Sequence, residues 1–184
     1  GRGVAAGGKN PLGGGWRGAQ GPVNGTTPRR EGGVGYLRMP GFNEKTADGL
    51  EKAVRELKKQ IGPGIKGYVL DLRNNPGGLV DQAVQVSDDF LSGGEIVSMR
   101  GRRSSDTQRY DAKPGDNTDG KPSVLLINIG SASASAIVSG PLQYHTRASL
   151  IGMPSLAKGS LQSSLPTGER GVGVHLALVP QCTP

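Results

Sequence analysis

From residue 34 onward, short apolar runs alternate with amphipathic stretches, and this alternation restricts the chain to few folds. The apolar stretch IKGYVLDL is nearly continuous, which is typical of a strand covered on both faces. We expect strands at residues 34–39, 65–72, 95–99, 123–129 and 148–152. We expect helices at residues 43–61, 79–91 and 132–145. The pattern predicts an α/β layered fold with a mostly parallel central sheet and flanking helices.

Glycines and polar clusters indicate where these elements begin and end. Thr46 is the expected N-cap of the first helix, and the GPG run at 62–64 is expected to end it. The glycine pair at 93–94 is expected to end the second helix. Residues 101–122 are polar and predict a long exposed loop or hairpin, and the tail from Ser160 predicts one hairpin.

The first 33 residues differ in composition from the rest of the chain. Twelve of the 32 glycines fall there, together with prolines and arginines and without apolar periodicity. Such a composition is typical of a linker or a disordered arm. The sequence therefore predicts an arm at residues 1–33 and a folded core at residues 34–184.

Charge and cysteine content exclude several kinds of site. The net charge is +7, but the basic residues are dispersed and no nucleic-acid-binding motif is present, so a nucleic-acid partner is not expected. Two Arg-Gly pieces in the arm leave nucleic-acid binding through the arm as an alternative. That alternative predicts a salt-dependent affinity that is lost when residues 1–33 are deleted. Cys182 is the only cysteine and the two histidines are far apart, so neither a disulfide nor a zinc site is expected, and no cofactor is expected. No apolar run is long enough to span a membrane.

Two segments rich in small residues follow expected parallel strands. They are RNNPGG at 73–78 and GSASAS at 130–135. Ligands of parallel α/β sheets bind at the carboxyl ends of the strands, where the next helices begin. Ser133 would lie in the first turn of the helix that follows, where unpaired N–H groups favour a developing negative charge.

A serine nucleophile needs a base. His145 follows Ser133 on the same expected helix at a distance of about 18 Å, too far for a hydrogen bond. His175 has no helpful neighbours in the sequence. Lys158 lies among small and apolar residues, and burial of a lysine lowers its pKa enough for it to accept a proton. A lysine in a surface loop remains the alternative reading of Lys158.

Four stretches, in order, resemble the C-terminal processing peptidases, also called tail-specific proteases. They are GYLRMPGFNEKT, GYVLDLRNNPGGLVDQAV, INIGSASASAIVSGPLQ and GMPSLAKGSLQSSLP. The resemblance covers residues 33–178 and implies a layered ClpP/crotonase-like core. It also implies a serine endopeptidase that cleaves proteins with apolar tails near their C-terminus, and it leaves a homo-oligomer open. For localisation it implies the periplasm, the cell envelope or the thylakoid lumen.

The resemblance also assigns residues by position. Ser133 corresponds to the nucleophile, Lys158 to the general base and Gln162 to the residue that orients the lysine. The backbone N–H groups of Gly78 and Ala134 correspond to the oxyanion hole, with Gly77 shaping the turn. A backbone donor of this kind contributes about 3–4 kcal/mol to the stability of a transition state.

The chain departs from the family pattern at four positions. Ala136 replaces a glutamate, Tyr144 an aspartate, and Leu156 and Ala157 an aromatic residue and a glycine. No pattern of the PDZ domain that precedes the family's core is visible in residues 1–33, so we expect a catalytic core without it. Two alternatives follow: a catalytically impaired family member, or an apolar-ligand-binding module like the retinoid-binding repeats that share this core. Retention of Ser133, Lys158 and Gln162 favours the enzyme.

Overall fold

The computed structural model describes residues 27–99, 107–155, 160–167 and 171–178, and it describes side chains within 32–99 and 107–155. The helices and strands of these residues are β1 (Thr27–Glu31), β2 (Val34–Arg38), α1 (Thr46–Ile61), the 3₁₀ turn η1 (Gly62–Gly64), β3 (Gly67–Asp71), α2 (Val80–Asp88), β4 (Glu95–Met99), β5 (Gln108–Asp111), β6 (Ser123–Ile127), α3 (Ala134–Tyr144), β7 (Ala148–Gly152), β8 (Ser160–Thr167) and β9 (Gly171–Leu178).

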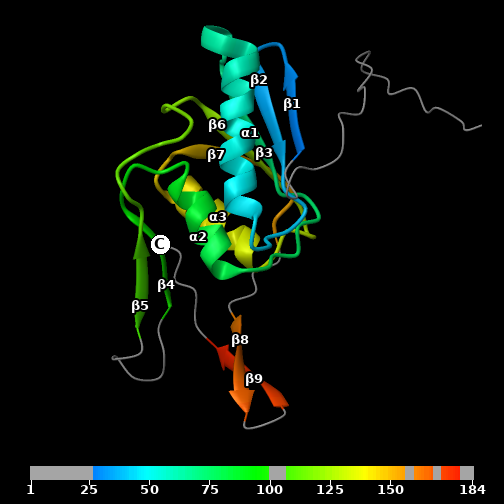
Figure 1. The fold of residues 1–184 in the computed structure, drawn as a ribbon, viewed down its shortest axis with the longest axis vertical. Coiled ribbons are helices and arrows are strands. Elements are labelled where there is room, and N and C mark those ends of the chain that lie inside the picture. The colour runs from blue at the N-terminus through cyan, green and yellow to red at the C-terminus, as the bar shows by residue number, and fades with distance from the viewer. Residues whose placement is uncertain (1–26, 100–106, 156–159, 168–170, 179–184) are drawn as a thin grey trace, which may run out of the picture.

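The centre of the fold is a five-stranded sheet in the order β1-β2-β3-β6-β7 (Figure 1). Strands β2, β3, β6 and β7 run parallel, and β1 pairs antiparallel with β2. The α/β fold with a mostly parallel sheet and flanking helices is thus confirmed. Because β3 and β6 are parallel neighbours, the segments that follow them leave the same edge of the sheet, although about 50 residues separate them in sequence.

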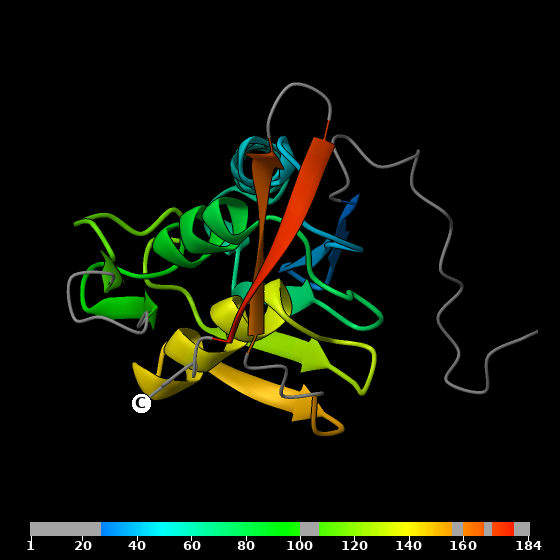
Figure 2. The same cartoon turned by 90° about the horizontal axis from the view of Figure 1, so that it is seen from below.

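The three helices lie on one side of this sheet, as Figure 2 shows end-on. Alternate strand residues, among them Leu37, Leu70 and Leu125, point to that side and are fully buried. They pack with the apolar stripe of α1 that the sequence predicted, Leu50, Val54, Leu57 and the less buried Ile61. On the other face of β3, Val69 is half-buried, so the expected cover on both faces is incomplete within the described residues.

Several helix ends differ from the sequence expectations. The N-cap of α1 is Lys45, and Thr46 is its first helical residue. The Thr46 hydroxyl instead accepts the N–H of Asn43 outside the helix at 2.8 Å. Helix α2 ends at Asp88, before the 93–94 glycine pair, because Phe90 N–H bonds back to the Ser87 carbonyl in a tighter turn.

Two hairpins stand outside the central sheet. The polar stretch 101–122 contributes β5, which pairs antiparallel with β4, and β8 pairs antiparallel with β9 as expected for the tail. Residues 27–31, inside the expected arm, form β1, since pairing with β2 satisfies their backbone groups without an apolar pattern. In the described part of the chain no helix has the length and apolar character to cross a membrane.

Candidate active site

The turns after β3 and β6 are tied to each other at the carboxyl edge of the sheet. Asn128 Oδ1 accepts the backbone N–H of Asn74 at 2.9 Å, and Asn128 Nδ2 donates to Asn74 Oδ1 at 2.9 Å. The two segments that the sequence singled out, 73–78 and 130–135, therefore meet in space, as expected for the carboxyl ends of neighbouring parallel strands.

The three serines of the second segment have different environments. Ser131 Oγ donates to the Leu72 carbonyl at 2.8 Å, and Ser135 Oγ donates to the Asn75 carbonyl at 2.9 Å. Both side chains are buried. Ser133 is half-buried, and within the described residues its hydroxyl has no hydrogen-bond partner. Ser131 and Ser135 thus join the two turns, and Ser133 keeps its hydroxyl available.

Ser133 has a strained backbone at the start of a helix. It is the N-cap of α3, with φ 52° and ψ −114°, a conformation that a residue with a side chain rarely adopts. Ala132 N–H bonds to the Asn75 carbonyl at 3.0 Å before it, and Ala136 N–H bonds to the Ser133 carbonyl at 2.8 Å after it. These bonds on both sides hold the strained residue in place.

The double glycine lies against this strained turn. Gly77 and Gly78 have φ 109° and φ 141°. A Cβ atom at position 77 would lie 2.8 Å from the Ser133 Cβ and 3.0 Å from the Ala134 nitrogen. Only glycine combines this close approach with this backbone conformation. The sequence expectation that Gly77 shapes the turn agrees with its position.

The orientation of Gly78 follows from its pairing with Phe42. Phe42 N–H donates to the Gly77 carbonyl, and the Phe42 carbonyl accepts from Leu79 N–H, both at 3.0 Å. In such a parallel bridge the N–H of the intervening residue points to the opposite side. Within the described residues neither Gly78 N–H nor Ala134 N–H donates a hydrogen bond. Gly78 is exposed and Ala134 is buried, so solvent reaches only the first of these residues.

The side chains of the expected base and of its partner lie outside the described ones. Lys158 lies outside the described residues. Gln162 lies in β8 opposite Leu176 of β9, and its side chain is outside the described ones. His145 is at the far end of α3 from Ser133, with its Nε2 2.8 Å from the Glu95 carbonyl, so the exclusion of His145 as a base for Ser133 is confirmed. His175 lies in β9.

The family departures fall at different distances from Ser133. Ala136 is half-buried and lies three residues after Ser133, on the same face of α3. Tyr144 is exposed at the other end of α3, where its ring packs edge-on against His145 at 5.0 Å. Leu156 and Ala157 lie outside the described residues. Of the two described departures, Ala136 is the one near the nucleophile segment.

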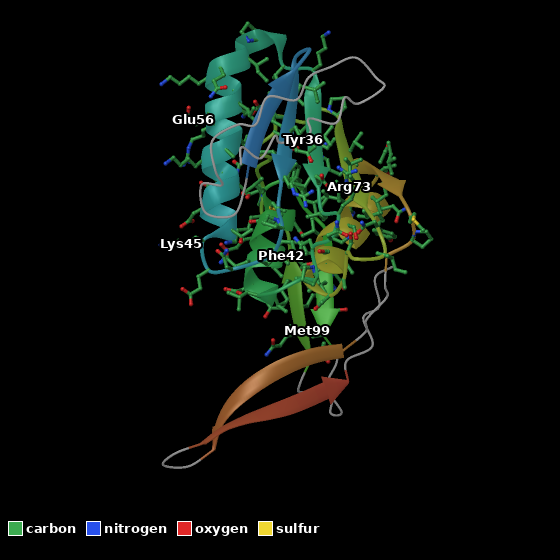
Figure 3. The ribbon with its side chains drawn as sticks, turned by 90° about the vertical axis from the view of Figure 1, so that its right-hand side faces the viewer. Tyr36, Phe42, Lys45, Glu56, Arg73 and Met99 are labelled. Carbon is green, nitrogen blue, oxygen red and sulfur yellow. The ribbon has the colours of Figure 1, made fainter. Side chains whose placement is uncertain are left out.

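A charged cluster beside the first turn was not foreseen from the sequence. Asp71, at the end of β3, is fully buried and accepts hydrogen bonds from Tyr36, Arg38 and Arg73. Burial alone would raise the pKa of Asp71, but the bonds from Arg73 and Tyr36 outweigh it and hold that pKa at about 2. Figure 3 shows Tyr36 and Arg73 next to each other on one side of the sheet. The available signal was an acidic residue inside the apolar run 65–72.

Asn75 is the second residue that the sequence reasoning missed. Its side chain is fully buried and bonds to Gly77 N–H and to the Met39 carbonyl, both at 2.9 Å. The signal was an asparagine directly before Pro76, since asparagine side chains commonly bond to the backbone two residues on. Among the described residues, no three side chains of the metal-binding types are grouped together.

Comparisons with known proteins place this arrangement among peptidases. A family model described as peptidase family S41 matches residues 33–184. The carboxy-terminal-processing protease of Bartonella bacilliformis is 56% identical over 144 residues, which cover 78% of this chain and 33% of that protein. The carboxyl-terminal-processing protease of Synechocystis is 35% identical over 151 residues, covering 82% of this chain and 34% of that protein.

A solved structure of a photosystem II D1 C-terminal processing protease has a similar fold. Its TM-score is 0.67 at 32% identity, covering 80% of this chain and 36% of that one. The chain thus spans about a third of the length of the curated relatives it matches.

Proposed function

The chain belongs to peptidase family S41, as the sequence resemblance predicted, and we propose that it hydrolyses peptide bonds near the C-terminus of protein substrates. The observation that carries this proposal is the environment of Ser133. Among three neighbouring serines, it is the one whose hydroxyl is free within the described residues, at a strained helix start against a double glycine. Strain at a single polar residue is common where a nucleophile must be held in one orientation.

The proposed reaction begins with attack of Ser133 Oγ on a peptide carbonyl. Lys158, in its neutral form, takes the hydroxyl proton and passes it to the leaving amine, and Gln162 orients the lysine. Water, activated by the same lysine, then hydrolyses the acyl-enzyme. Neither Lys158 nor Gln162 is placed by the described side chains, so their roles rest on the family motif.

The oxyanion of the tetrahedral intermediate needs donors that are already oriented. We assign Gly78 N–H and Ala134 N–H to this role. Gly78 is exposed and its N–H points away from Phe42, so substrate meets this donor first. Ala134 N–H follows the nucleophile directly and lies at the positive end of the α3 dipole. Burial of Ala134 lowers the local dielectric constant and strengthens its interaction with an anion.

We propose as substrates unstructured proteins with apolar C-terminal tails, and as setting the periplasm, the cell envelope or the thylakoid lumen. Both follow from the family resemblance. Nucleic acid is not an expected partner. A homo-oligomer remains open, and the molar mass in solution would decide it. The division into an arm and a core at residue 33 also remains a proposal, with β1 as the described exception.

The test is cleavage of an unfolded protein with an apolar tail, with fragment masses giving the cut position. Ser133→Ala and Lys158→Ala should each reduce cleavage to the background rate. Ser131→Ala removes a buried hydroxyl two residues away, and Lys59→Ala removes an exposed lysine, so both should cleave in proportion to their folded fraction. Full activity of Lys158→Ala would exclude the dyad.

A second candidate function is supported by Ala136. The position one turn after Ser133 lacks the glutamate of the family pattern, which is compatible with a catalytically impaired member or an apolar-ligand-binding module. If the chain is a catalytically impaired member, the unaltered chain would not cleave protein tails and Ala136→Glu would restore cleavage. If it is an apolar-ligand-binding module, it would bind a retinoid without cleaving any tail.

A further inference from the structure

Asn75 bonds to several of the backbone segments that meet near Ser133. Its own N–H bonds to the Leu72 carbonyl at 3.1 Å. Its carbonyl accepts two hydrogen bonds, from Ala132 N–H at 3.0 Å and from Ser135 Oγ at 2.9 Å. One residue therefore bonds to the residue that follows β3 and to both sides of the strained nucleophile.

The side chain of Asn75 makes two further connections. Asn75 Oδ1 accepts Gly77 N–H at 2.9 Å, and Nδ2 donates to the Met39 carbonyl at 2.9 Å. Met39 directly follows β2, so the amide fixes the glycine turn relative to a second strand of the sheet. The side chain is fully buried, and loss of either bond would leave a buried backbone group without a partner.

From these contacts we propose that Asn75 is the positioning residue that holds the Gly77–Gly78 turn at a fixed distance from Ser133. This inference rests on the proposed function, in which Gly78 N–H is an oxyanion donor. The backbone carbonyl of Asn75 holds the nucleophile segment, and its side chain holds the turn. A displacement of the turn relative to Ser133 would move one donor away from the developing charge, whereas the nucleophile itself would stay in place.

Asparagine is suited to this role by its two different ends. The amide presents an acceptor to Gly77 N–H and a donor to the Met39 carbonyl at once. Aspartate would keep the acceptor, but at neutral pH it would face the Met39 carbonyl with a second oxygen. Pro76 restricts the backbone of Asn75 to extended conformations, which orients the amide before any substrate binds.

The first test compares Asn75→Ala with Gln82→Ala. Gln82 is a matched control because its buried side-chain amide accepts Ala47 N–H at 3.0 Å, a bond to α1 that involves neither the Gly77–Gly78 turn nor Ser133. Asn75→Ala should lower kcat about 10²–10³-fold, the effect of losing one oriented oxyanion donor, and change KM less than about threefold. Gln82→Ala should lower the melting temperature with kcat per folded molecule within about twofold of the unaltered chain. Equal losses of kcat in the two variants, or an unchanged kcat in Asn75→Ala, would overturn the proposal.

The second test uses Asn75→Asp and its pH profile. At low pH the introduced carboxyl group is protonated and can again donate to the Met39 carbonyl. The ratio of its kcat to that of the unaltered chain, taken at each pH, should therefore rise as the pH falls. A ratio that is constant with pH would contradict the role of the donor.

Hydrogen exchange separates this inference from the proposed function. In the unaltered chain the Gly77 amide should be protected, and Asn75→Ala should speed its exchange at least tenfold while amides of β3 keep their rates. If the unaltered chain showed no peptidase activity, the proposed function would fail, and the exchange data would still decide whether Asn75 holds the turn. Unchanged exchange at Gly77 would reject the positioning role whatever the activity.

Discussion

Gly77 lies directly against Ser133, so that a Cβ atom at position 77 would be 2.8 Å from the Cβ of the serine. The two residues belong to turns that follow different strands, and their contact brings the double glycine to the start of α3. The two turns can approach this closely because residue 77 has no side chain.

Gly77→Ala should disrupt both the turn and the activity. The added methyl group would also lie 2.9 Å from the Ala132 carbonyl oxygen, and φ 109° is unfavourable for alanine. We expect a loss of about 1–3 kcal/mol in the free energy of unfolding, measured in urea, and at least a 100-fold fall in kcat/KM. Gly93→Ala is the control, because a Cβ atom there meets nothing within 4 Å. Equal behaviour of the two variants would refute the steric explanation.

Ser135→Ala should weaken the hold on the Asn75 carbonyl without releasing it. Ala132 N–H still bonds to that carbonyl in this variant. We expect a loss of about 1 kcal/mol in unfolding free energy and a kcat reduced less than in Asn75→Ala. Ser131→Ala removes a similar buried bond, to the Leu72 carbonyl, and should cost similar stability while kcat per folded molecule stays unchanged. A larger kcat loss in Ser131→Ala would argue against Asn75 as the centre of the contacts.

Asp71→Asn should destabilise the chain at neutral pH but not in acid. The folded pKa of about 2 lies below the ordinary value of 3.8, so the carboxylate stabilises the fold fully above about pH 4 and loses that effect as the pH falls to 2. The shift corresponds to about 2 kcal/mol, which urea unfolding at pH 7 should show as the difference between the two chains. At pH 2, close to the folded pKa, most of the difference should be lost. A difference that persisted there would mean that shape, not charge, is what Asp71 provides.

Asp89→Asn should stabilise the chain above neutral pH. Burial, followed by the nearby charge of Glu51, raises the pKa of Asp89 to about 7, with Asp88 and Asp116 adding to the rise. Because the folded pKa lies above the ordinary value of 3.8, the contribution of Asp89 is most favourable below about pH 4 and is lost as the pH rises through 7. One carboxyl oxygen of Asp89 is buried without a partner, so the charged form is poorly accommodated.

Thermal unfolding at pH 8 and pH 4 checks this prediction. We expect Asp89→Asn to gain about 1–2 kcal/mol at pH 8, since the amide that replaces the carboxylate still accepts from Asn117. The gain should shrink or reverse at pH 4. Glu56→Gln, which changes an exposed carboxylate on α1 (Figure 3), should be neutral at both pH values. A pH-independent effect of Asp89→Asn would show that its charge does not control stability.

The sequence alone determined the layered fold and the position of the two turns. The spacing of apolar residues predicted the strands and helices, because burial of one face repeats apolar residues at a different interval in a helix than in a strand. The sequence also excluded His145 as the base for Ser133, since the rise per residue of a helix fixes the distance between them. The roles of Lys158 and Gln162 rest on the family motif and remain predictions.

The tertiary structure decided what local patterns cannot encode. The hydrogen bonds from Asn75 to Met39 and Ser135 join residues 36 and 60 positions apart, and the Asp71 cluster joins β2 to the turn after β3. The exact ends of α1 and α2 likewise depend on contacts outside each helix. Local sequence determines which elements form, because propensity and periodicity act over a few residues. The geometry at Ser133 depends on hydrogen bonds that exist only once β2, β3 and β6 have paired.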